Sequence, residues 1–234
     1  MTSQPQPRRP LRIVDAGDSA IVAEFGDRID LDVNAHVVAL AAALADCGVP
    51  GIRDVVPTYK SVAVHFDPLT TPYDTLVESI RAASDRSGAQ ANADRAPIRI
   101  PVCYDNVFGM DLPAVARFAG VSEREVARLH TGQVYRVFML GFAPGFAYMG
   151  SVDDRIAAPR HGSPRRRVPA GSVGIADRQT GVYPSELPGG WQIVGRTPMR
   201  LVRPNASDPF LLKAGDVVEF YAMTRDDFER WPSA

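Results

Sequence analysis

Short apolar runs interrupted by glycine or proline every few residues fill the chain from Tyr135 onward. A helix needs a sustained apolar period of 3.6 residues, and proline removes a backbone donor from a helix interior. No stretch of this half keeps such a period for long. Short strands joined by tight turns fit the pattern, so we expect a second domain that is mostly β and closes as a barrel.

The first half of the chain has longer periodic segments. Residues 11–14 and 20–25 are apolar runs around the turn-rich link 15–19, which predicts a hairpin. Residues 30–46 carry apolar side chains on one helical face and stop near Gly48, which predicts an amphipathic helix.

A second strand pair and a second helix follow. Residues 52–56 and 61–66 predict strands, with His65 facing away from the apolar side chains as a structural residue. Thr71 and Pro72 predict the start of a helix that the threonine caps. The predicted order of the first half is therefore ββαββα.

Residues 85–97 (DRSGAQANADRAP) lose all periodicity and have the composition of an exposed linker. We therefore place a domain boundary near residue 96, with an α+β domain over 1–96 and the β-barrel domain over 97–234.

The start of the second domain contains its clearest helices. Residues 98–102 predict a strand, and 111–119 predict a short helix closed by Gly120. Ser122 with glutamate three residues later forms a capping box for another helix, which ends near His130.

The chain's net charge of -1 conceals a basic segment. Residues 155–203 contain nine arginines and two acids, so this segment carries +7 and the remainder -8. Such a run is either a solvated face or a site for a small anionic substrate, and both interpretations stay open. The overall balance favours no nucleic-acid partner.

The remaining composition points to a soluble chain. No stretch approaches the ~20 apolar residues of a membrane span, and the polar N-terminus lacks a signal core. Cys47 and Cys103 lie in no CxxC or metal-ligand spacing, so we expect two buried thiols in a reducing cytoplasm.

Glycine and proline at the density found after Tyr135 serve either tight barrel turns or a ligand-lined loop. Between these glycines stand side chains that supply hydrogen-bond donors, an amide and an aromatic wall, a mixture typical of pockets. These candidate binding residues are Arg167, Ser172, Gln179, Tyr183, Trp191, Arg196 and Thr197.

No catalytic signature is complete, which favours a binding domain. Ser172 lies in no GxSxG elbow, the phosphate-binding loop pattern is missing, and the four histidines show no metal-ligand spacing. His130 is a candidate general base, although a histidine at a helix end also suits the helix dipole. His161 is expected in a surface loop, and Phe146 and Tyr148 in the barrel core.

Several uncommon strings together resemble one family. They are His130, YRVFMLGF at 135–142, PGF at 144–146, PAGSVGIA at 169–176, QTG at 179–181 and GGW at 189–191. Over nearly its whole length the chain resembles the family known as allophanate hydrolase subunit 1 or as the B subunit of 5-oxoprolinase, which includes inhibitors of a sporulation kinase. Asp177 departs from the resemblance, since glycine is common there, and this leaves the substrate's identity in doubt.

The resemblance implies an α+β domain followed by a cyclophilin-like β-barrel. It also implies a cytoplasmic heteromer with a larger subunit from the same operon, similar to allophanate hydrolase subunit 2 or to the C subunit of 5-oxoprolinase. Such a complex uses ATP to hydrolyse 5-oxoproline to glutamate. On this hypothesis Arg167 and Arg196 bind the substrate's carboxylate, Ser172 and Gln179 orient its carbonyl or amide, and further candidates wall the pocket.

Two alternatives from other classes remain open. The chain resembles the carboxyltransferase half of enzymes that handle carboxybiotin, as in urea metabolism. It also resembles regulatory proteins that inhibit a histidine kinase by contact.

Overall fold

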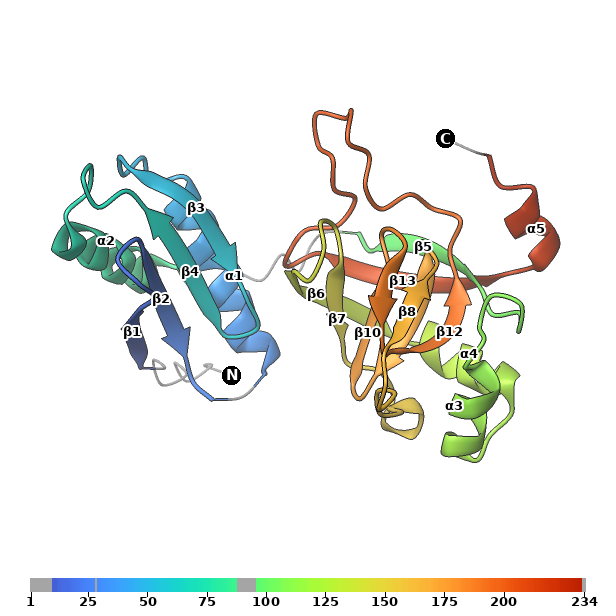
Figure 1. Cartoon of the computed structure of the whole chain (residues 1–234). Helices are drawn as coiled ribbons and strands as arrows, with labels where there is room; N and C mark the ends of the chain where they lie inside the picture. Colours follow the sequence, from blue (N-terminus) through green and yellow to red (C-terminus); the bar gives the residue numbers. More distant parts are fainter. Residues whose placement is uncertain (1–9, 28, 88–95, 233–234) are drawn as a thin grey trace. The chain divides into compact units, whose positions relative to one another are not determined.

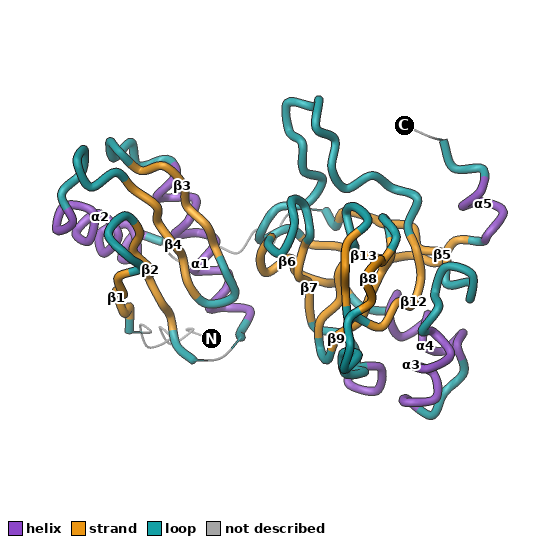
Figure 2. The backbone as a smooth tube through the Cα atoms, viewed as in Figure 1, coloured by secondary structure: helices purple, strands orange, loops and turns teal. Residues whose placement is uncertain are grey.

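A computed structural model describes residues 10–27, 29–87 and 96–232 (Figures 1 and 2). The chain forms two compact units, Met1–Ala93 and Asp94–Ala234. The predicted linker falls largely on residues 88–95, which lie outside the described residues, so the boundary at residue 96 stays a prediction.

The first unit is a four-stranded antiparallel sheet with two helices against it (Figure 1). Its elements follow the predicted order ββαββα, and the strands lie in the order β1-β2-β4-β3. Their bounds are β1 (Leu11–Asp15), β2 (Ala20–Phe25), α1 (Leu31–Ala45), β3 (Ile52–Pro57), β4 (Ser61–Phe66) and α2 (Tyr73–Arg86).

Local sequence explains these elements. The Asp30 carboxylate accepts hydrogen bonds from the amides of Asp32 and Val33, at 2.9 and 3.1 Å, and so caps α1. The apolar face of α1 is buried against the sheet, together with alternate residues of β4. His65 points to the exposed side of β4, as predicted.

Two local predictions are wrong. The Thr71 hydroxyl donates to the carbonyl of Pro50, so α2 begins at Tyr73 without a side-chain cap. The side chain is used to close the turn before β3 instead. Cys47 is exposed because it follows the last turn of α1, whereas Cys103 is buried at the end of its strand as expected.

The second unit is built on a closed barrel, which confirms the predicted β architecture. The strands follow each other around the barrel in the order β10-β7-β6-β13-β5-β12-β9. They are β5 (Ile98–Cys103), β6 (Val134–Leu140), β7 (Ala147–Gly150), β9 (Ser172–Ala176), β10 (Gln179–Val182), β12 (Gln192–Arg196) and β13 (Val217–Met223).

Shorter elements surround the barrel (Figures 1 and 2). Helices α3 (Leu112–Ala119) and α4 (Glu123–Thr131) pack on each other, and α5 (Arg225–Glu229) follows β13. Gly120 ends α3 in a left-handed conformation, and Ser122 caps α4, both as predicted. A short 3-10 helix, Asp154–Ile156, precedes β8 (Arg165–Val168), which forms a two-stranded antiparallel sheet with β11 (Leu187–Gly189).

The turn between β9 and β10 explains the departure at Asp177. This residue has a positive φ of 51°, a conformation that favours glycine and that aspartate tolerates better than most residues. Its amide donates to the carbonyl of Ala158 at 2.8 Å. Aspartate in place of glycine therefore preserves the hairpin turn. Asp177 does not line the cavity described below.

The barrel strands separate two groups of buried side chains. Val173 and Ile175 of β9 point into the main core of the barrel, while Ala176 joins a smaller core with Trp191 and Ile193. Since successive strand residues face opposite sides, the smaller core lies on the outer face of the barrel wall. Within the described ranges, no helix is long and apolar enough to span a membrane.

Candidate functional site

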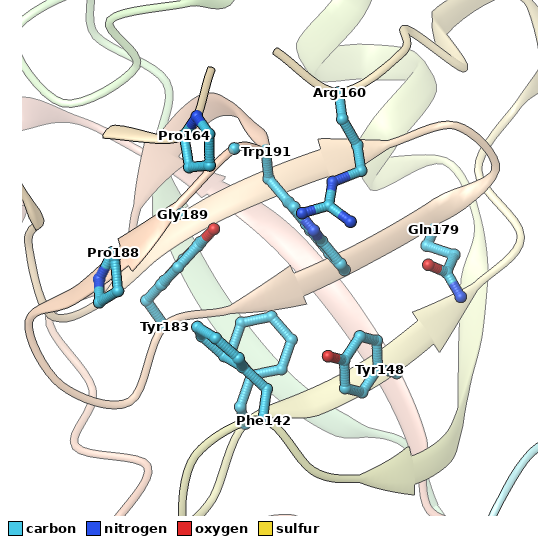
Figure 3. A pocket seen from close by; sticks show the side chains of 11 residues that line it. Phe142, Tyr148, Arg160, Pro164, Gln179, Tyr183, Pro188, Gly189 and Trp191 are labelled. Carbon is cyan, nitrogen blue, oxygen red and sulfur yellow. The ribbon is translucent and has the colours of Figure 1, made fainter. Parts of the chain in front are cut away.

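A cavity of about 260 Å³ opens beside this smaller core (Figure 3). Aromatic rings form much of its wall, and a single charged side chain, Arg160, enters it. The lining residues are Phe142, Phe146, Tyr148, Arg160, Pro164, Gln179, Tyr183, Pro188, Gly189, Gly190 and Trp191.

Two glycines let the indole of Trp191 lie against the strands. Gly174 of β9 pairs with Gly181 of β10. A Cβ atom at Gly174 would lie 3.0 Å from the Cβ of Trp191, and one at Gly181 would lie 3.1 Å from its ring. Side chains at these positions would displace the indole, so glycine at both positions leaves the room in which the indole forms a wall of the cavity.

Phe146 is the centre of the aromatic wall. Its ring meets those of Tyr148, Tyr183 and Trp191 edge-to-face, with centroids 4.9, 5.2 and 5.3 Å apart. Such contacts are favourable because the positive ring edge faces the negative ring face. The wall is therefore held in place before any ligand arrives.

The cavity is electrically positive and its phenols are protonated. Among the described residues, no carboxylate lies within ion-pair distance of Arg160, and none lines the cavity. Burial raises the pKa of Tyr148 and of Tyr183, while the nearby Arg160 charge opposes that shift. Both phenols can therefore donate hydrogen bonds at neutral pH, beside a fixed cation and the amide of Gln179.

A buried carboxylate anchors the segment that carries Arg160. Asp111 precedes α3 and is only 5% exposed. Its oxygens accept hydrogen bonds from Arg165, at 2.5 Å, and from the amide of Ile193, at 2.7 Å. His161 Nε2 lies 3.3 Å from the same carboxylate, so this histidine is half-buried rather than a free surface side chain.

The structure brings three of the seven predicted binding residues to the cavity: Gln179, Tyr183 and Trp191. Trp191 is buried, although two glycines precede it.

The other four predicted residues lie elsewhere. Arg167 is exposed and forms a paired hydrogen bond with Glu186, at 2.8 and 3.0 Å, so its charge is already matched. Arg196 donates to the carbonyl of Ala170 at 2.7 Å. The buried Ser172 and Thr197 lie at the ends of β9 and β12, and none of the four lines the cavity.

His130 lies in the barrel core, away from the cavity lining. Its Nδ1 is 2.6 Å from the Tyr104 hydroxyl, and its Nε2 is 2.8 Å from the hydroxyl of Thr180. Thr180 donates its own proton to the carbonyl of Gly174, at 3.0 Å, so the histidine carries its proton on Nε2. Burial lowers the pKa of His130 to about 3. This geometry suits a neutral structural histidine, and the catalytic role stays a prediction.

Sequence reasoning missed Arg160. It was one of nine arginines in the basic segment, in a stretch without periodicity, and nothing in its neighbours marks it. Three of the others, Arg165, Arg167 and Arg178, pair with carboxylates remote in sequence. A pattern cannot show which guanidinium is left to face a cavity.

Residues 11–212 match the family model for the carboxyltransferase domain, subdomain C and D. The chain is 40% identical over 230 residues to the B subunit of 5-oxoprolinase from Bacillus subtilis, covering 94% of this chain and 96% of that one. The chain belongs to the carboxyltransferase-domain family and, within it, to the 5-oxoprolinase B subunits.

Other members and neighbours agree. The B subunit of 5-oxoprolinase from Escherichia coli O157:H7 is 38% identical over 87% of this chain and 92% of its own length. A conserved protein of Pyrococcus horikoshii, PH0987, is 41% identical, with coverage of 93% and 100% and a TM-score of 0.56. The protein TTHA0988 has a TM-score of 0.80 at 35% identity; the match covers 87% of this chain but 40% of that longer one.

A more distant neighbour shares the fold alone. The urea amidolyase of K. lactis is 20% identical, with a TM-score of 0.77 over 98% of this chain and 16% of that one. In the present chain, the cavity supplies a cation, phenols and an amide, and none of the described residues that line it is a serine, cysteine, histidine or carboxylate. Such a set can bind and orient a ligand, and its two phenols are poor bases and nucleophiles because burial raises their pKa.

Proposed function

We propose that this chain is a subunit of a cytoplasmic, ATP-dependent 5-oxoprolinase that converts 5-oxoproline to glutamate. The observation that carries the proposal is 40% identity to the B subunit of a 5-oxoprolinase over nearly the full length of both chains. The cavity agrees with it, because a lone guanidinium in an aromatic pocket suits a small carboxylate.

The chain acts with a partner. The relatives are named as subunits, and the described lining of the cavity contains no serine, cysteine, histidine or carboxylate to act as nucleophile or base. A larger subunit of the C type, encoded in the same operon, supplies the missing groups, and ATP is the co-substrate of the assembled complex. ATP is needed because the lactam is an unstrained amide that hydrolyses slowly, and phosphoryl transfer can activate its carbonyl.

The test is reconstitution. The chain is co-expressed with the product of its neighbouring gene, purified, and supplied with the third component of the system. We expect ATP hydrolysis and glutamate formation to depend on 5-oxoproline and to stop when this chain is omitted. A stable complex that gives no stimulation would refute the proposal. Co-purification with a biotinylated protein, or capture of a histidine kinase, would then support the carboxyltransferase or regulatory alternative.

A further inference from the structure

We propose that the cavity is the subsite for the carboxylate-bearing lactam ring, with Arg160 at the carboxylate and Gln179 at the ring amide, and that ATP binds elsewhere in the complex. This assignment rests on the proposed function and adds to it that the two substrates bind at separate sites. It transfers the carboxylate-binding role from Arg167 and Arg196 to an arginine that the sequence did not single out.

Size is the first argument. Pockets for drug-sized ligands measure about 300–1,000 Å³, and this cavity, at about 260 Å³, lies just below that range. A single small ring with one carboxylate is therefore a better match than a nucleotide, which carries a base, a sugar and three phosphates.

Charge is the second argument. Arg160 is the one charged group among the described residues that line the cavity, so the site offers a single positive charge in partly apolar surroundings. One carboxylate balances it. A triphosphate would bring several negative charges into the same space, and the lining has neither a second cation nor a glycine-rich helix start to bind them.

The remaining polar groups complement a lactam. The amide of Gln179 offers both a donor and an acceptor, and the adjacent N–H and C=O of a lactam offer the converse pair. Figure 3 shows Gln179 and Tyr148 on the side of the cavity opposite Pro188, with the Arg160 guanidinium reaching in beside Trp191. The aromatic wall around Phe146 supplies flat apolar surface for the ring's carbon atoms.

The test separates the two substrates kinetically in the reconstituted complex. Arg160→Ala removes the cation. Gln179→Glu replaces the amide proposed to pair with the ring by a carboxylate of almost the same size, which cannot donate to the lactam carbonyl. We expect either change to raise the KM for 5-oxoproline about 10- to 100-fold, the scale of one charge-assisted contact, and to leave the KM for ATP within about twofold. Arg200→Ala, an exposed arginine outside the lining, is the matched control and should change neither constant.

Each outcome decides something. Variants with an unchanged KM for 5-oxoproline, beside an active wild-type complex, would overturn the subsite assignment and leave the proposed function standing. A rise in the KM for ATP would instead place the nucleotide in this cavity. An inactive wild-type complex would remove the proposed function, and the subsite assignment with it. Circular dichroism and thermal melting of each variant would confirm that the fold is intact. We expect this because Arg160 is exposed and Gln179→Glu hardly changes the size of the side chain.

Discussion

The buried imidazole of His130 predicts a stability that depends on pH in a specific window. Its pKa is about 3 in the folded chain because burial disfavours the charged form, against 6.5 for an exposed histidine. Below pH 6.5 the unfolded chain takes up a proton that the folded chain does not. The contribution of His130 is therefore complete above pH 6.5 and is lost progressively as the pH falls toward about 3.

The size of the effect follows from the shift. One pKa unit corresponds to about 1.4 kcal/mol, so the full window represents roughly 5 kcal/mol, and lowering the pH by about two units from the start of the window removes about 3 kcal/mol. His130→Gln is the comparison, since glutamine offers an acceptor to Tyr104 and donors to Thr180 but does not titrate. Other groups that titrate in this range, mostly carboxylates, are common to both proteins and cancel in the difference.

The measurement is urea unfolding followed by tryptophan fluorescence. Both tryptophans, Trp191 and Trp231, belong to the barrel unit, so the signal reports the unit that contains His130. Unfolding free energies are measured for both proteins near pH 8 and about pH 4.5. We expect the wild type to lose about 3 kcal/mol more than the variant across this interval. Parallel pH profiles would show that His130 titrates normally in the folded chain and would refute the argument.

Three further predictions concern other parts of the chain. Asp111→Asn keeps an oxygen that can accept from the backbone but removes the charge. We expect the unfolding free energy to fall by about 2 kcal/mol, and the KM for 5-oxoproline to rise because the segment that carries Arg160 loosens. An unchanged urea midpoint and an unchanged KM would contradict this. Gly189→Ala sets a methyl group against the phenol of Tyr183, and we expect a loss of about 1–3 kcal/mol that Tyr183→Phe partly relieves in the double variant; an equal loss in both backgrounds would place the clash elsewhere. In the native chain a thiol reagent should modify Cys47 rapidly and Cys103 only on unfolding, because Cys103 is covered and burial raises its pKa; two fast thiols would be inconsistent with the fold.

Regular elements with a clear period were predictable from the sequence. The helix α1 buries Val33, Val37, Leu40 and Leu44 at helical spacing and has an aspartate at its start, and the strand β4 alternates cleanly, so local rules suffice for both. The prediction for Thr71 was wrong because its hydroxyl has a tertiary partner, the carbonyl of Pro50, which no local rule can foresee.

The candidate site was predictable only in part. Gln179, Tyr183 and Trp191 lie in strings dense in glycine, and such strings do mark where backbone and ring approach closely. Arg167 was a reasonable candidate for the binding site, because the partner that neutralises it, Glu186, lies 19 residues further along the chain. Whether an arginine is matched or free is decided by tertiary contacts, and these are invisible along the chain.

The alternation along β10 has an evolutionary consequence. Thr180 faces the core and supports His130, whereas Gln179 lines the cavity and Gly181 lies against the rings of Phe146 and Trp191. Folding and ligand preference therefore act on interleaved positions of one strand rather than on separate regions. Replacement of the outward Gln179 would alter ligand preference without disturbing the inward residues, so a saturation library over β10 should tolerate changes at Gln179 and reject them at Thr180. Gly181 should also be intolerant, because a side chain there would displace the indole of Trp191.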